Sequence, residues 1–156
     1  MYTMRLTRRV NAPRSAVYRA LLDASAVAAW RVPEGMTSRV HEFDPREGGV
    51  FRISLVYDDP ASTGKSGGHT DTYQGRFTRL VPDEQVVEVL EFETADPALR
   101  STMTMTTTLT DAEGGTDVHL LHEGIPDAVP AADNELGQRM ALDKLAELVE
   151  TGGAPR

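Results

Sequence analysis

Apolar and polar residues alternate along most of the chain, and only its last part has a sustained helical repeat. The stretch from Asp127 to Glu150, chiefly its second half from Gly137, places apolar residues at helical spacing. Between Met36 and Glu123 the pattern is mostly the alternation that is typical of half-buried strands. Both patterns are buried at once if the strands form a curved antiparallel sheet and the final helix closes over its inner face.

The expected order of elements is one strand, two short helices, six strands and one long helix, which is an α+β fold. We expect Asn11, or the residue after it, to cap the first short helix, and Ser25 to cap the second, Ala26 to Trp30. Residues 1–150 are expected to form one domain, followed by a flexible tail at 151–156. The expected strands are residues 3–10, 37–43, 50–57, 69–81, 85–93, 100–110 and 116–122.

Two features interrupt the strand pattern. Gly75 lies inside a strand, which indicates either a bulge or the close approach of another element. Residues 58–68 form a hairpin tip that is rich in glycine and small polar residues. A tip of this length suits either a lid or a disordered loop, and the sequence leaves both open.

The composition excludes several classes of protein. The 156 residues include no cysteine, which rules out disulfides, thiol nucleophiles and zinc–thiolate sites. A net charge of −8 argues against nucleic acid or an anionic membrane surface as a partner. No apolar run approaches the ~20 residues of a membrane helix. The N-terminus also lacks the apolar core of a secretory signal, so we expect a cytoplasmic location.

Few residues suggest chemistry. No phosphate loop, dinucleotide fingerprint or metal motif is present, so no cofactor is expected, and His119 and His122 stand on opposite faces of a strand. His122 shares its face with apolar residues and is either a structural histidine, a ligand contact or an acid/base group. Glu88 also has inward parity and is the second catalytic candidate. The parity of His69 and Asp71 would bring them to the mouth of a cavity.

The inward-facing apolar side chains either pack an ordinary core or form the wall of a ligand pocket, and both interpretations stay open. They are Trp30, Phe51, Ile53, Leu55, Tyr57, Tyr73, Phe77, Met103, Met105, Val118 and Leu120, with Leu142 on the final helix.

Short motifs occur in a characteristic order along nearly the whole chain. They are Asn11-Ala-Pro13 before Val17-Tyr18, Trp30 followed by Pro33-Glu-Gly35, Phe43-Asp44 before Gly48-Gly49-Val-Phe-Arg52, Tyr73-Gln-Gly75, His122-Glu-Gly124 and Leu142-Asp-Lys-Leu145. In order and spacing they resemble the START-like helix-grip superfamily, SRPBCC, and its branch named after the activator of the ninety-kilodalton heat-shock protein ATPase. The resemblance implies a sheet of about seven strands around the C-terminal helix, with a hydrophobic cavity between them. Members bind lipids, hormones or polyketides, and some are cyclases or hydratases.

One position departs from the family pattern. Members commonly have Gly-Trp at the start of the final helix, where this chain has Gly137-Gln138. Gln138 falls on the apolar stripe of Leu142 and Leu145, and a glutamine buried without partners costs roughly 1–3 kcal/mol. We therefore expect Gln138 to point into an enlarged, wetter cavity, unless the helix begins slightly differently.

The sequence favours a protein that binds an apolar, lipid-like or aromatic molecule between sheet and helix. Because no catalytic residue is firm, binding is favoured over catalysis. Two alternatives remain, a cyclase- or hydratase-type enzyme using His122 or Glu88, and a co-chaperone-like partner of a stress ATPase. Leu136 and Met140, opposite Leu145 on the final helix, suit a dimer contact or a cover for the cavity mouth, so monomer and homodimer both stay open.

Overall fold

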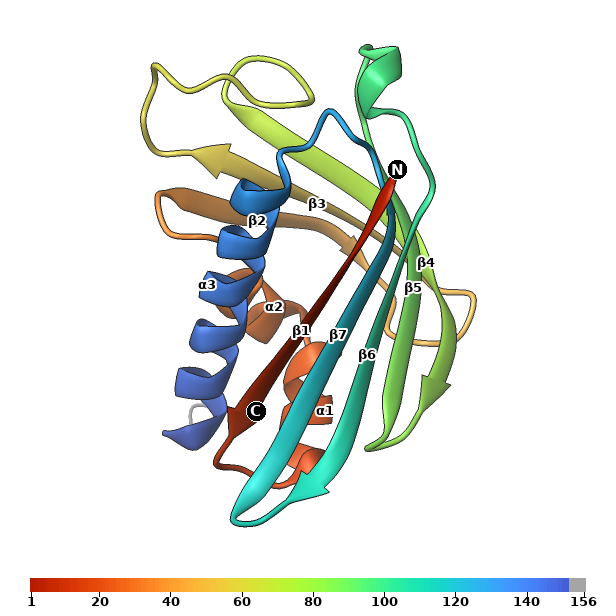
Figure 1. Ribbon diagram of the computed structural model, residues 1–156, viewed down its shortest axis with the longest axis vertical. Coiled ribbons are helices and arrows are strands. Elements are labelled where there is room, and N and C mark those ends of the chain that lie inside the picture. The colour runs from red at the N-terminus through yellow and green to blue at the C-terminus, as the bar shows by residue number, and fades with distance from the viewer. Residues whose placement is uncertain (152–156) are drawn as a thin grey trace.

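The computed structural model describes residues 1–151 and contains a seven-stranded antiparallel sheet with strand order β1-β7-β6-β5-β4-β3-β2 (Figure 1). The strands are β1 (Tyr2–Val10), β2 (Met36–Phe43), β3 (Val50–Tyr57), β4 (Thr70–Val81), β5 (Gln85–Phe92), β6 (Met103–Ala112) and β7 (Gly115–Ile125). The helices are α1 (Arg14–Leu21), α2 (Ala24–Trp30) and α3 (Ala131–Glu150), and a 3-10 turn, η1, covers Pro97–Leu99. The predicted α+β helix-grip fold is confirmed.

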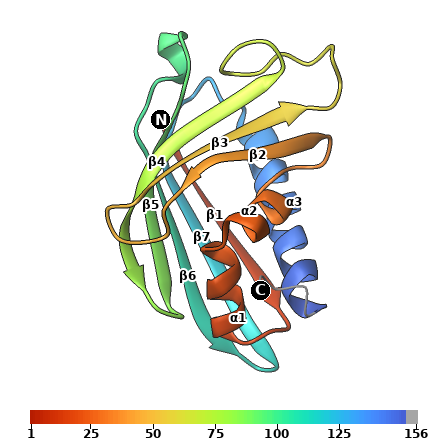
Figure 2. The same cartoon turned by 180° about the vertical axis from the view of Figure 1, so that it is seen from behind.

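The helices gather on one side of the curved sheet and close it. α3 packs against the edge strand β1, and α2 packs against the other edge strand, β2 (Figure 2). Because α2 and α3 also contact each other, the two helices bridge the open side between the sheet edges. The core lies in the space that they enclose.

The final helix buries one side of its second half. Leu142, Leu145 and Val149 are buried, as their spacing predicts, together with the small residues Ala141 and Ala146. The first half, residues 131–140, contains no fully buried residue, and Leu136 is 54% exposed. The helix is therefore anchored by its C-terminal half. Among the described residues, no helix is both long enough and apolar enough to span a bilayer.

The expected helix caps are wrong. The Asp23 carboxylate caps α2 by accepting a hydrogen bond from the Ala26 amide at 2.9 Å, and Ser25 already lies inside the helix. Pro13 occupies the capping position of α1 and makes no side-chain cap, while the Asn11 amide donates to the Glu150 carboxylate at 2.8 Å. The sequence shows which residues are of a type that can cap a helix. The backbone conformation determines which of them stands at the first position of the helix.

Gly75 is required by close approach. It lies between Phe51 on β3 and Leu90 on β5, and a Cβ atom there would collide with the Val89 carbonyl oxygen. The irregularity in β4 falls further along, between Phe77 and Arg79. Of the two interpretations of this glycine, the structure shows the close approach.

The loop after β3 is tied to the start of β4. Lys65 Nζ lies 2.9 Å from the buried Asp71 carboxylate, and the Thr72 amide donates to Ser66 Oγ at 2.7 Å. These contacts hold residues 58–68 against the sheet. Most of the tail expected at 151–156, namely residues 152–156, lies outside the described residues.

Candidate functional site

A small cavity lies between α2, α3 and the inner face of the sheet. Its volume is about 20 Å³, which is room for about one water molecule. The apolar part of its wall consists of Leu21, Trp30, Val86, Met105, Leu120 and Leu142. Its polar part consists of Arg31, Glu88, Thr107 and Gln138. A mixed wall of this kind is typical of ligand sites, in which a few polar groups orient an otherwise apolar molecule.

The strongest polar feature of the wall is a buried ion pair. Arg31, at the C-terminal end of α2, donates from Nη1 to Oε1 of Glu88 on β5 at 2.7 Å. The two side chains are only 13% and 5% exposed. The Arg31 guanidinium also lies 5.2 Å from the Tyr73 ring centroid and 5.8 Å from that of Phe51. Aromatic faces attract a cation, so the sheet supplies both the counter-ion and the platform for Arg31.

The protonation states of Arg31 and Tyr73 follow from burial and from the neighbouring charges. Burial, the largest single influence, would lower the pKa of Arg31, but Glu88 and Tyr73 together outweigh it and raise that pKa above its usual value. Arg31 is therefore a permanent cation. Burial raises the pKa of the Tyr73 hydroxyl, and the Arg31 charge opposes that rise only in part. Tyr73 is therefore protonated and uncharged at neutral pH.

His122 lies on the same inner face, on β7 beside Met105 of β6. It is 4% exposed, and neither ring nitrogen has a hydrogen-bond partner among residues 1–151. Burial first, and the Arg31 charge second, lower the pKa of His122 to about 4. The ring is therefore a neutral imidazole with one N–H donor and one acceptor nitrogen that the protein itself leaves unused.

The predicted wall residues divide into two groups. Trp30, Met105, Leu120 and Leu142 border the cavity. Others fill the core and do not reach it, namely Phe51, Ile53, Tyr73, Phe77, Met103 and Val118. The aromatic rings among them pack together, with centroids 5.2 Å apart for Phe51 and Phe77. Leu55 and Tyr57 are only half-buried, because they lie toward the end of β3 where the sheet edge opens.

Gln138 is half-buried and lines the cavity, so it faces the sheet–helix space rather than bulk solvent. The cavity beside it is not enlarged, however, because neighbouring side chains leave a volume of only about 20 Å³. Glu88 points inward as its parity predicts, and His119 stands on the other face of β7, bonded to Thr7 and Thr110. The expectation for His69 is wrong, because this exposed residue bonds the Ser62 carbonyl of its own loop.

The sequence interpretation missed Arg31 and Thr107. Arg31 directly follows Trp30 in a short helix, where an arginine is normally exposed, and nothing local indicates that its head turns inward to Glu88. Thr107 has the same parity as Met105, so its inward direction was readable from the alternation. Asp71 is buried, as its parity indicates, but its partner is Lys65 in the loop.

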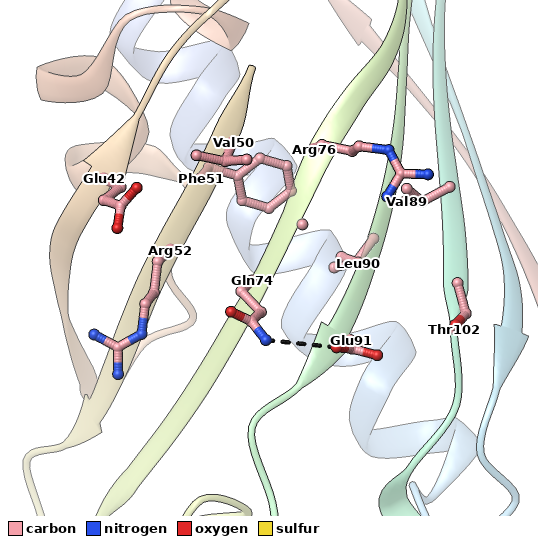
Figure 3. A pocket seen from close by; sticks show the side chains of 11 residues that line it. Glu42, Val50, Phe51, Arg52, Gln74, Arg76, Val89, Leu90, Glu91 and Thr102 are labelled. Carbon is pink, nitrogen blue, oxygen red and sulfur yellow. Dashed lines mark hydrogen bonds between the residues drawn. The ribbon is translucent and has the colours of Figure 1, made fainter. Parts of the chain in front are cut away.

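A second and larger depression, of about 390 Å³, crosses the outer face of β3, β4 and β5. Figure 3 shows the lining side chains along β3, β4 and β5, with α3 behind the sheet; among these side chains, Phe51 and Leu90 belong to the buried core. Two of the polar side chains of the depression are engaged with neighbours, Gln74 with Glu91 and Arg52 with Glu93. The inner cavity is the better candidate site because the buried ion pair of Arg31 and Glu88 lines it, and because the unpartnered His122 lies on the same inner face of the sheet. Within the described residues, no three acidic or histidine side chains come together as a metal site.

Comparison with known proteins agrees with this architecture. The family model described as activator of Hsp90 ATPase homolog 1-like protein matches residues 11–150. The chain belongs to this family. A search of the curated proteins found no match.

Solved structures of several other proteins share the fold. A protein from Chromobacterium violaceum is 38% identical with a TM-score of 0.85, over 95% of this chain and 96% of that one. The AHSA1 protein from Silicibacter pomeroyi is 19% identical with a TM-score of 0.76, over 97% and 99% of the two chains. A Rhodobacter sphaeroides protein is 20% identical with a TM-score of 0.79, over 96% and 92%. The last two show the fold alone.

Proposed function

We propose that this member of the Hsp90 ATPase activator homolog family binds a small, largely apolar molecule between the sheet and α3. The observation that carries the proposal is the group of polar side chains inside the core, and above all the unpaired imidazole of His122. A buried polar group without a partner costs roughly 1–3 kcal/mol, and a buried ion pair is often no more stabilising than apolar residues of the same size. A ligand that bonds these groups would account for their presence.

The size of the cavity sets a condition on binding. Ligand pockets usually enclose roughly 300–1,000 Å³, whereas the space beside Gln138 is about 20 Å³. The ligand therefore enters only if part of the wall moves. The first half of α3 suits this movement, because residues 131–140 bury no side chain fully.

The contacts that limit this movement are few. Asn134 Nδ2 donates to Met4 Sδ at 3.7 Å, and Pro33 packs near Gly137. Displacing the start of α3 loses these contacts but leaves Leu145 and Val149 in the core. Burial of an apolar ligand then returns about 25 cal/mol per Å² of surface removed from water.

Catalysis is the weaker alternative. With its pKa near 4, His122 is a weak base at neutral pH. Glu88, the other catalytic candidate, is already engaged by Arg31. Both candidates suit the orientation of a bound molecule better than proton transfer.

A panel of apolar fluorescent probes, combined with native mass spectrometry of the purified chain, tests the proposal. We expect saturable binding of one probe per chain and an increase in melting temperature with probe concentration. The Arg139→Trp variant adds an aromatic ring on the exposed side of α3 and should bind as the wild type does. Absence of binding by every probe, together with an unchanged melting temperature, would rule the proposal out.

A further inference from the structure

We infer that the ligand of this cavity is electrically neutral and carries a hydroxyl or carbonyl group that hydrogen-bonds to the buried polar cluster. The polar cluster is Arg31, Glu88, Thr107 and Gln138, which line the cavity, together with the buried His122, which lies behind the wall on β7 beside Met105. This inference rests on the proposed function and adds to it the chemical class of the ligand.

The charge balance of the cavity favours a neutral ligand. The one cation at the cavity, Arg31, is already neutralised by Glu88 at 2.7 Å among the described residues. The other titratable groups that face Arg31 are His122 and Tyr73, and both are uncharged at neutral pH. A carboxylate ligand would lie beside Glu88 without a counter-charge of its own, and an ammonium ligand would meet Arg31. Either charge would be desolvated without compensation, which the site disfavours strongly.

The hydrogen-bond donors and acceptors of the polar cluster favour a polar atom on the ligand. The guanidinium of Arg31 carries five N–H donors, of which one binds Glu88 and another makes a weak contact to Met105 Sδ at 3.6 Å, while Tyr73 lies beside the group. His122 keeps one N–H and one bare nitrogen free. The Gln138 amide, which lines the cavity, adds a donor and an acceptor of its own.

A hydroxyl group on the ligand can donate a hydrogen bond to the cluster and accept one from it. A carbonyl group can accept hydrogen bonds from the N–H donors, which outnumber the free acceptors of the cluster. A pure hydrocarbon would remove the same groups from water and leave them unpaired. A site built to bond a polar atom discriminates against the analogue that lacks it. The body of the ligand is apolar, since it meets Trp30, Leu120 and Leu142.

Four probes that share one ring system test the inference. They are 2-naphthol, naphthalene, 2-naphthoate and 2-naphthylmethylammonium, titrated into the wild-type chain near pH 7.5 with calorimetry or NMR shifts as the readout. We expect 2-naphthol to bind about tenfold more tightly than each of the other three. This ranking is measured on the unaltered chain and does not depend on any variant that folds poorly.

The Glu88→Gln variant sharpens the test because it leaves the Arg31 charge unbalanced. We expect 2-naphthoate to gain about tenfold over 2-naphthol in this variant. The matched control is Glu91→Gln, which makes the same change on the outer face of the same strand and should preserve the wild-type ranking.

The outcomes separate the two proposals. If the wild type binds a charged probe most tightly, or binds all four equally, the inference of a neutral polar ligand is overturned while ligand binding itself stands. If no probe of any charge binds, the proposed function and this inference both fail.

Discussion

At the scale of single residues, each of Arg31 and Glu88 needs the charge of the other to be stable in the core. Both are buried, so removing one head group leaves the other as an uncompensated charge. We predict that Glu88→Gln lowers the free energy of unfolding by about 3 kcal/mol or more. In the double variant Arg31→Met/Glu88→Leu, most of that loss should be recovered. Urea denaturation of the single and double variants measures both effects.

A surface ion pair supplies the matched control. Asp143 binds Arg8 at 2.9 Å, but its side chain is 66% exposed. Asp143→Asn should therefore change the free energy of unfolding by less than about 1 kcal/mol. Equal losses for Asp143→Asn and Glu88→Gln would show that burial does not strengthen the interior pair.

His122 makes stability depend on pH in a defined window. In the folded protein its pKa is lowered from 6.5 to about 4, so the unfolded chain takes up the proton first. The free energy of unfolding should therefore fall as pH drops from 6.5 toward 4, by about 3 kcal/mol from this group. The His122→Leu variant should lose that part of the pH dependence.

The comparison is made by urea denaturation at several pH values for both proteins. His119→Gln, on the outer face of the same strand, is the control and should leave the wild-type pH dependence in place. Parallel curves for the wild type and His122→Leu between pH 6.5 and 4 would contradict the assignment.

At the scale of elements, replacing two glycines by alanine should change the stability in opposite directions. Gly137 lies in the middle of α3, where an added Cβ would make an ordinary contact with Pro33 at 3.5 Å. Gly137→Ala should therefore stabilise the protein by about 0.5–1 kcal/mol through helix propensity alone. Gly75→Ala should destabilise it by about 1–3 kcal/mol or more, because the obstacle is the Val89 backbone. Thermal unfolding of both variants, with the opposite signs expected, is the measurement.

Gln138 is the position on α3 that most directly controls the cavity. A tryptophan there would fill the space that Gln138 now borders and would also remove an amide from the polar cluster. We predict that Gln138→Trp weakens 2-naphthol binding about tenfold or more, because the ring is larger than the cavity and occupies the space that the ligand needs. Calorimetric titration measures the binding, with Arg139→Trp as the equal-sized change on the exposed face. Unchanged affinity in Gln138→Trp would place the ligand elsewhere.

At the scale of the whole molecule, the proposed binding of a ligand requires α3 to move away from the sheet at one end. The two halves of α3 are anchored unequally, since Leu145 is fully buried and Leu136 is 54% exposed. We predict that amides of residues 131–140 exchange with solvent faster than those of 141–150, and that bound 2-naphthol slows the first group selectively. Hydrogen exchange measured with and without the probe checks this. Uniform exchange along α3 would exclude an opening at its first half.

Local patterns predicted the fold because each one depends on its own segment. Alternation gave the strands and their inward residues, including Phe51 and His122, and the 3.6-residue repeat gave the final helix. Gly75 was likewise readable as a special position, since glycine inside a strand needs a reason in the neighbouring strands.

The sequence by itself therefore determined the element order, the sheet with its covering helix, and which faces turn inward. Only the tertiary structure decided that Arg31 meets Glu88, that Asp23 rather than Ser25 caps α2, and that the cavity beside Gln138 is small. The physical reason is the distance along the chain between the residues that determine each feature. Periodicity records the direction of each side chain along its own element, whereas ion pairing and cavity volume depend on atoms that distant segments bring within a few ångströms.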